Sequence, residues 1–187
     1  MKLKKKETDI WTGTYKGVGF EINNWKTPPN SVEPNEKDCW TYYIYLHLDR
    51  IPEENKPNSY WLKGRKDRKR VYYDYYKHDV MNELDWHGGL TWYSKEHGFD
   101  GSGKVIKIGC DYSHSWDEGQ YFDLDIVKSE LKNTIERFLN YVPDYKHWCC
   151  GNGNLYKINE GVMRGEQFYS KEYWGDKDRF KELELQA

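Results

Sequence analysis

The chain has 187 residues, enough for one domain that buries about 70% of the surface its unfolded form exposes. It holds 17 tyrosines and 9 tryptophans but few aliphatic residues, so the core must be largely aromatic, and such a content argues against a disordered chain. The formal net charge of −2 argues against a protein coated with positive potential, although a local basic patch stays open.

No run of about 18 apolar residues exists, which excludes a membrane-spanning helix. The basic start MKLKKK lacks the apolar stretch of a signal peptide, so we expect a protein that stays in the cytoplasm of the cell that makes it, with no membrane contact. Residues 1–9 read as a flexible basic tail on a single globular domain, 1–187. The four cysteines show no disulfide-framework spacing and should be reduced thiols: Cys39, Cys110, Cys149 and Cys150.

The first half of the chain has strand patterns separated by loops. Residues 10–23 alternate apolar and polar side chains around three glycines and predict a short hairpin. Residues 26–38 hold three prolines and predict a loop. Residues 40–48 (WTYYIYLHL) form the clearest strand, and its two apolar faces predict a central strand that is covered on both sides.

The second half contains a hairpin and a helix. After a proline-bearing loop and an ambiguous tyrosine-dense segment, residues 89–95 and 104–110 predict two antiparallel strands joined by a glycine-rich connection. Residues 123–142 carry apolar side chains at three- and four-residue spacing and predict the main amphipathic helix, capped by Asp123 or Asp125. Residues 176–186 predict a short C-terminal helix. The order favours an α+β fold, an antiparallel sheet with the main helix packed on one face.

Polar side chains gather at the adjoining ends of the predicted hairpin strands. His87 precedes the first strand, while Asp111, His114 and Asp117 follow the second. If Lys95 pairs with Lys104, His87 lies opposite Tyr112 and within reach of Asp111 or His114. The glycines after His87 would let another backbone or a ligand approach closely.

This set suits a divalent metal ion or acid and base chemistry near neutral pH. His87, Asp111 and His114 are the expected metal ligands, and His87 and Asp117 the expected catalytic pair. The alternative is structural, because a His or Asp at a strand end commonly forms a turn or a satisfied hydrogen bond.

Two other clusters admit a binding role. The run RKDRKR, flanked by Trp61 and several tyrosines, could contact phosphates and stack bases or hold a partner; otherwise it is a solvated loop. Its basic residues are Arg65, Lys66, Arg68, Lys69 and Arg70. His147, Cys149 and Cys150 invite a zinc site, but adjacent cysteines fit tetrahedral geometry poorly, and buried thiols are favoured.

The segments HGGLT (87–91), GCDYSH (109–114) with Asp117, and YFDLDIVKSELKNTIERF resemble a widespread family of uncharacterised phage and prophage proteins. That family has HGGxT, then GxDCAHxxD, then YRDxxYVxxEV and a helix. This chain departs from it with Tyr112 in place of the usual cysteine. The resemblance implies a mobile-element origin, and with it a location in the host bacterial cytoplasm, and it brings no established activity. DWHGGLTW is also similar to the HG strand of ADP-ribosyltransferases, whose histidine grips NAD, but the Tyr and Glu that follow there cannot be assigned.

Two function classes follow as expectations, and whether the chain is an enzyme is left open. The first is a phage accessory protein that counters a host defence system by binding a host defence protein, as an anti-CRISPR-like inhibitor does. The alternative is a metal-assisted hydrolase of a phosphorylated or nucleotide substrate at the His87 and Asp117 site. A nucleic-acid binder using the basic run is a further reading.

Overall fold

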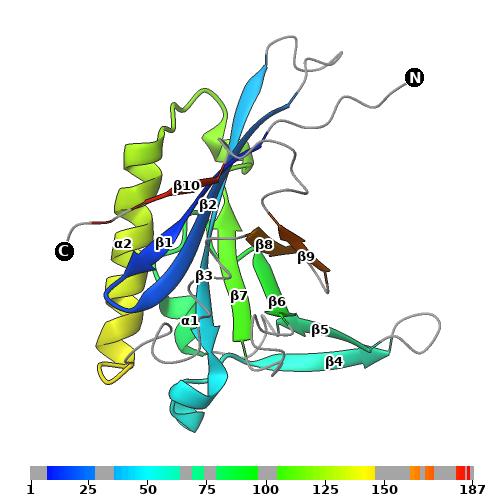
Figure 1. The fold of residues 1–187 in the computed structure, drawn as a ribbon, viewed down its shortest axis with the longest axis vertical. Helices are drawn as coiled ribbons and strands as arrows, with labels where there is room; N and C mark the ends of the chain where they lie inside the picture. The colour runs from blue at the N-terminus through cyan, green and yellow to red at the C-terminus, as the bar shows by residue number, and fades with distance from the viewer. Residues whose placement is uncertain are drawn as a thin grey trace.

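A computed structural model describes residues 8–27, 36–63, 69–73, 79–96, 105–145, 161–164, 167–170, 180–183 and 185. Ten strands, two α-helices and three short 3-10 helices are assigned within these ranges (Figure 1). In chain order they are β1 (Thr8–Tyr15), β2 (Val18–Thr27), β3 (Lys37–His47), η1 (Leu48–Arg50), η2 (Glu53–Asn55), β4 (Ser59–Lys63), β5 (Lys69–Tyr73), α1 (Val80–Glu83), β6 (Trp92–Glu96), β7 (Val105–Asp111), η3 (Ser115–Asp117), α2 (Leu124–Tyr141), β8 (Gly161–Arg164), β9 (Gln167–Ser170) and β10 (Phe180–Glu182).

The main sheet has six strands in the order β10-β1-β2-β3-β7-β6. Neighbours from β1 to β6 pair antiparallel, and β10 pairs parallel with β1. Helix α2 lies along one face of this sheet (Figure 1). Two further antiparallel pairs, β4 with β5 and β8 with β9, stand apart from it in the pairing pattern. The predicted α+β fold, an antiparallel sheet with one main helix on one face, is therefore confirmed.

The first hairpin is longer than the predicted residues 10–23, and β1 begins inside the predicted tail. Tyr15 pairs with Val18, so the turn consists of Lys16 and Gly17 alone. Both have positive φ, 47° and 82°, as a two-residue turn matching the right-handed twist of the strands requires. Strand β3 is interior to the sheet and buried on both faces, as predicted for residues 40–48.

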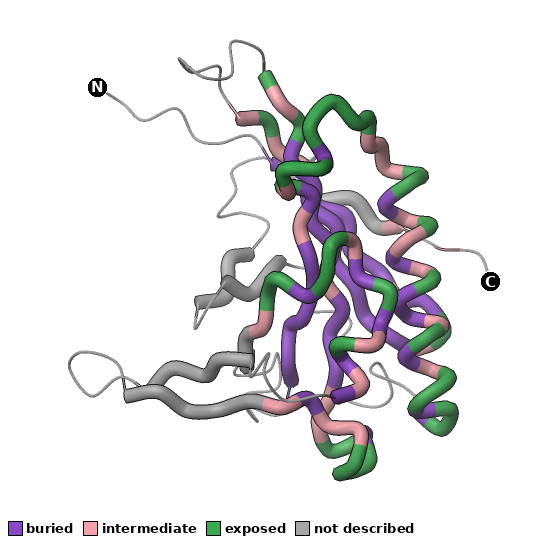
Figure 2. Tube along the Cα trace, turned by 180° about the vertical axis from the view of Figure 1, so that it is seen from behind, coloured by how far each residue is buried: buried purple, intermediate pink, exposed green. Residues whose placement is uncertain are grey.

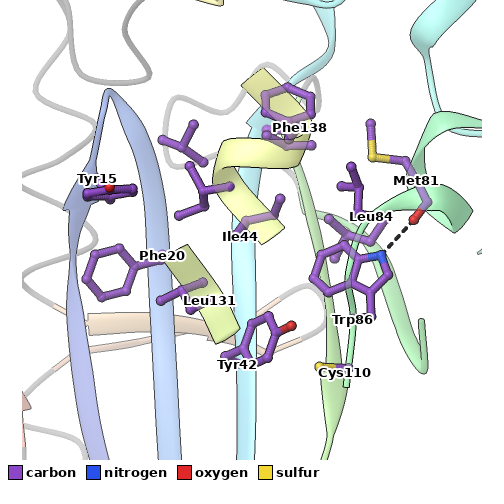
Figure 3. Packing of buried hydrophobic residues seen from close by; sticks show 14 of the residues in the cluster. Tyr15, Phe20, Tyr42, Ile44, Met81, Leu84, Trp86, Cys110, Leu131 and Phe138 are labelled. Atoms are coloured by element: carbon purple, nitrogen blue, oxygen red, sulfur yellow. Dashed lines mark hydrogen bonds between the residues drawn. The ribbon is translucent and has the colours of Figure 1, made fainter. Parts of the chain in front are cut away.

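Helix α2 confirms the predicted helix 123–142. The Asp123 side chain accepts a hydrogen bond from the Ile126 amide at 2.9 Å and so caps the first turn. Its buried stripe packs on the sheet face that carries Phe20, Tyr42 and Ile44 (Figure 3). The residues of the stripe are Val127, Leu131, Thr134, Ile135 and Phe138. The core between helix and sheet is rich in aromatic rings, as the composition predicts.

The short C-terminal helix predicted at 176–186 is wrong for the residues described, because Phe180–Glu182 is strand β10. The Leu183 amide donates to the Thr12 carbonyl at 3.0 Å, and Leu183 and Leu185 pack against the core. Two leucines at i and i+2 follow the period of a strand. The edge of β1 offers unpaired backbone groups to this segment, and pairing with them outweighs the helix propensity of its charged residues.

The sheet face opposite α2 buries charge. The Lys107 ammonium lies 3.0 and 3.1 Å from the two carboxylate oxygens of Glu21, and Tyr45 and Asn23 donate to the same carboxylate at 2.6 Å. Burial by itself raises the pKa of Glu21, but the charge of Lys107 and these hydrogen bonds outweigh it, so the pKa lies below its ordinary value. Glu21 is therefore a buried, ionised and fully paired carboxylate.

Figure 2 shows from behind that the buried residues follow the sheet and the inner side of α2, while the connection between β7 and α2 is largely exposed. This connection, residues 112–123, lies at one end of the sheet beside the first turn of α2. Within the ranges that the structure describes, no helix is long and apolar enough to cross a membrane.

Candidate functional site

His87 lies in a tight segment between α1 and β6 that apolar side chains hold in place. Leu84, Trp86 and Leu90 are buried in the core. The Trp86 indole donates to the Met81 carbonyl at 2.6 Å, and the Gly89 amide donates to the Trp86 carbonyl at 3.2 Å (Figure 3 draws the indole bond). Since the residues on both sides of His87 are anchored, the imidazole has a defined position.

Both ring nitrogens of His87 meet carboxylates. Nε2 lies 2.9 Å from Oδ1 of Asp117, and Nδ1 lies 3.2 Å from Oε2 of Glu130. The Asp117 side chain is 1% exposed and the His87 side chain 14%. Each ring nitrogen thus has a carboxylate oxygen within hydrogen-bond distance. The ring thus bridges η3 and α2.

Aromatic rings enclose this bridge. The Tyr112 ring stacks on His87 with 3.9 Å between the ring centroids, and its hydroxyl donates to Oε2 of Glu130 at 2.7 Å. Phe122 stands edge-on to both rings, at 5.2 Å from His87 and 4.9 Å from Tyr112. Burial, followed by the nearby Tyr42 and Glu130, raises the pKa of Tyr112 far above its ordinary range, so this phenol acts as a hydrogen-bond donor.

His114 occupies the space that Gly88 leaves open. A Cβ atom on Gly88 would lie 2.1 Å from Nε2 of His114, and Gly88 has a φ of 63°. The His114 ring also stacks on Trp116, with 4.5 Å between the centroids. The His114 amide donates to Oδ2 of Asp117 at 3.0 Å. The close approach is therefore made at Gly88 by the His114 side chain, not by a backbone or a ligand as predicted, and nothing lies within 4 Å of an added Cβ at Gly89.

We call the four side chains His87, Tyr112, Asp117 and Glu130 the His87 clamp. It joins three parts of the chain: the segment before β6, the β7–α2 connection and the middle of α2. In this arrangement the imidazole is a cross-link, and both carboxylates that it meets are satisfied. The catalytic roles of His87 and Asp117 stay predictions, and the contact between these two side chains is a finding of the structure.

The predicted metal ligands His87, Asp111 and His114 do not converge. Cys110 faces the core beside α2, so Asp111, the next residue of β7, points to the opposite face, where its Cα partner is Thr41. Its carboxylate accepts from the Ser113 amide at 3.0 Å. Among the described residues, no group of three or more His, Cys, Asp or Glu side chains is placed to hold a metal ion.

The assumed hairpin register is also wrong, by two residues. Lys95 pairs with Ile106, and β6 begins at Trp92 because Gly88 and Gly89 both turn with positive φ. A shift of two positions keeps every side chain on its face, whereas a shift of one would reverse the faces. His87 and Tyr112 therefore still meet, through stacking of their rings.

The other two predicted clusters cannot be placed. Arg65, Lys66 and Arg68 lie outside the described residues, and for Lys69 and Arg70 only the backbone of β5 is described. His147, Cys149 and Cys150 also lie outside the described residues. Their binding roles stay predictions.

Sequence reasoning missed Glu130, which completes the clamp. The available signal is its place on α2, one turn from Thr134 and beside the buried stripe, where an acidic side chain needs a partner. It also missed two exposed aromatic residues of the β7–α2 connection. Trp116 is 58% exposed and Tyr121 77% exposed.

No protein-family model, curated protein or solved structure matches the chain.

Proposed function

We propose that this protein is a phage or mobile-element accessory protein that counters a host defence system by binding a host protein. The binding site is the aromatic surface, which we define as Trp116 and Tyr121 on the β7–α2 connection. The observation that carries the proposal is the exposure of these two large rings. Tryptophan and tyrosine are the side chains that most often anchor protein interfaces.

The aromatic surface is displayed on an ordered base. Trp116 precedes the clamp residue Asp117 and stacks on His114, while Tyr121 precedes Phe122, which packs against the clamp. The next residue, Asp123, caps α2. A connection held at both ends loses little conformational freedom when a partner binds, and this lowers the entropic cost of binding.

The mobile-element origin in this proposal is supported by the resemblance of HGGLT and GCDYSH to phage and prophage proteins. In this chain those two segments form the base of the aromatic surface. Gly88 packs against the His114 ring, and the His87 imidazole contacts the Asp117 carboxylate. The alternative, a metal-assisted hydrolase, loses its expected ligand set because Asp111 lies on the opposite sheet face. A binding role needs no such set.

The test uses bacterial strains that each carry one defence system, infected by a phage which that system restricts. Expression of the full chain should restore plaque formation on one strain of the panel. The double variant Trp116→Ala and Tyr121→Ala should lose this effect and keep the native circular dichroism spectrum. Tyr141→Ala removes an exposed aromatic ring at the far end of α2 and serves as the matched control.

Two results contradict the proposal. The first is a wild-type chain that restores plaques on no strain of the panel. The second is a double variant that restores them as well as the wild type, because the aromatic surface then has no part in the effect.

A further inference from the structure

The charged residues around the aromatic surface in the sequence are mainly acidic. Between Lys107 and Lys128 the sequence holds neither lysine nor arginine, while acidic residues flank both rings. Glu118 lies between Trp116 and Tyr121 and is exposed, and Asp125 follows on the first turn of α2, also exposed. The surface therefore combines open aromatic faces with negative charge.

Two other carboxylates of this segment already have partners within the fold. Asp117 is paired with His87, and Asp123 is engaged in capping α2. Lys128 forms an ion pair with Asp125, which offsets part of the charge at the helix end. Glu118 and Asp125 are thus the two exposed carboxylates beside the rings.

We infer that the aromatic surface binds an arginine-bearing face of a protein. This inference rests on the proposed function and names the chemistry of its partner. A guanidinium group is planar and weakly hydrated, so it stacks on tryptophan or tyrosine and pairs with a carboxylate at the same time. Trp116, Glu118 and Tyr121 offer both kinds of contact within six residues of chain.

Nucleic acid is the other class that exposed aromatic rings could bind, by base stacking. Binding of that kind needs lysine or arginine near the rings to neutralise phosphates. Here the nearest charged and exposed side chains are acidic, so phosphates are repelled. The observations favour a cationic protein face, and nucleic acid becomes an outcome of the test.

The experiment measures fluorescence anisotropy of a labelled peptide of twelve residues with six arginines, titrated with the full chain. A peptide with citrulline at the six positions keeps the shape and removes the charge, and a labelled single-stranded DNA of twelve nucleotides is the third probe. We expect the arginine peptide to bind about tenfold or more tightly than the citrulline peptide, and the DNA to bind more weakly than both.

Two variants locate the binding. Trp116→Ala with Tyr121→Ala should weaken peptide binding about tenfold, because both stacking faces are lost. Glu118→Gln with Asp125→Asn should weaken it about three- to fivefold and reduce its salt dependence, because two exposed charges are lost. Glu53→Gln with Glu54→Gln makes the same change of net charge on η2, where both side chains are exposed, and should leave binding unchanged. Asp123 stays intact in all variants because it caps α2.

Three results overturn the inference: equal binding of the arginine and citrulline peptides, unchanged peptide binding in the aromatic double variant, or DNA binding that this variant abolishes. The plaque test separates the two proposals. If the aromatic variant loses plaque restoration while Glu118→Gln with Asp125→Asn retains it in full, the surface binds a partner without the inferred charge, and the proposed function stands alone. If the aromatic variant retains plaque restoration, the proposed function itself fails.

Discussion

Gly88 and His114 are in direct contact, and a single added methyl group at Gly88 would lie 2.1 Å from Nε2 of His114. The contact explains why a glycine follows His87. It also links the segment before β6 to Trp116, because the same His114 ring stacks on that indole.

Gly88→Ala should lower the free energy of unfolding by about 2 to 4 kcal/mol. Alanine is strained at the positive φ of this position, and its Cβ would clash with the His114 ring. Urea unfolding measures this. Gly119→Ala is the control: it has a φ of 79° with nothing within 4 Å of the added Cβ, so it should lose only about 1 to 2 kcal/mol. Combining Gly88→Ala with His114→Ala should recover about 1 kcal/mol relative to the sum of the single changes. Strict additivity would contradict the contact.

His87→Phe keeps a ring against Tyr112 but removes both ring nitrogens. It leaves the buried Asp117 carboxylate without its imidazole partner, and we expect a loss of about 2 to 4 kcal/mol in the free energy of unfolding. Adding Asp117→Asn should restore part of this loss, because a neutral amide is easier to bury and its oxygen still accepts from the His114 amide. A change below about 0.5 kcal/mol for His87→Phe would show that the clamp does not stabilise the fold.

Glu21 should make the fold sensitive to acid. Burial raises its pKa, but the charge of Lys107 and the hydrogen bonds from Tyr45 and Asn23 lower it further, so the folded value lies below the ordinary 4.5. At pH values between the folded and the unfolded pKa of Glu21, the unfolded chain therefore binds more protons than the folded chain. The stabilisation is complete above the unfolded pKa and is lost as the pH falls through the folded value. Unfolding free energies measured from pH 7 down to pH 3 should fall less steeply for Glu21→Gln with Lys107→Met than for the wild type.

The same pair predicts a strong non-additivity. Lys107→Met alone leaves the Glu21 carboxylate buried without its cation and should lose about 3 to 5 kcal/mol. The double variant removes both charges and should lose clearly less than the sum of the single variants. Equal losses for Lys107→Met and for an exposed lysine such as Lys26→Met would contradict the buried pair.

Cys110 should be inert in the folded protein. Burial raises the pKa of its thiol far above the ordinary value, and the side chain has no exposed area. The test is alkylation by iodoacetamide at pH 8, followed by peptide mass spectrometry. Cys110 should stay unmodified in the native protein and should be modified almost completely in about 6 M guanidinium. Native labelling at the unfolded rate would contradict its burial.

The elements that sequence patterns predicted correctly are those whose causes lie within a few residues. The spacing of apolar residues in α2 and its Asp123 cap can both be read from residues 123–142. The apolar and aromatic composition of β3 by itself predicts that both of its faces are buried. The C-terminal segment failed as a helix because its state depends on the free edge of β1, which lies at the other end of the chain.

The candidate site divides in the same way. The sequence by itself predicted that His87 lies opposite Tyr112, because two neighbouring antiparallel strands must place their flanks side by side. Only the tertiary structure decided that Asp111 faces away and that Glu130 takes the second ring nitrogen. The orientation of Asp111 depends on which residues of β7 face α2. The contact of Glu130 with His87 depends on how α2 is rotated about its axis against the sheet. Such rotations are set by the packing of a whole buried face, which no local pattern of residues contains.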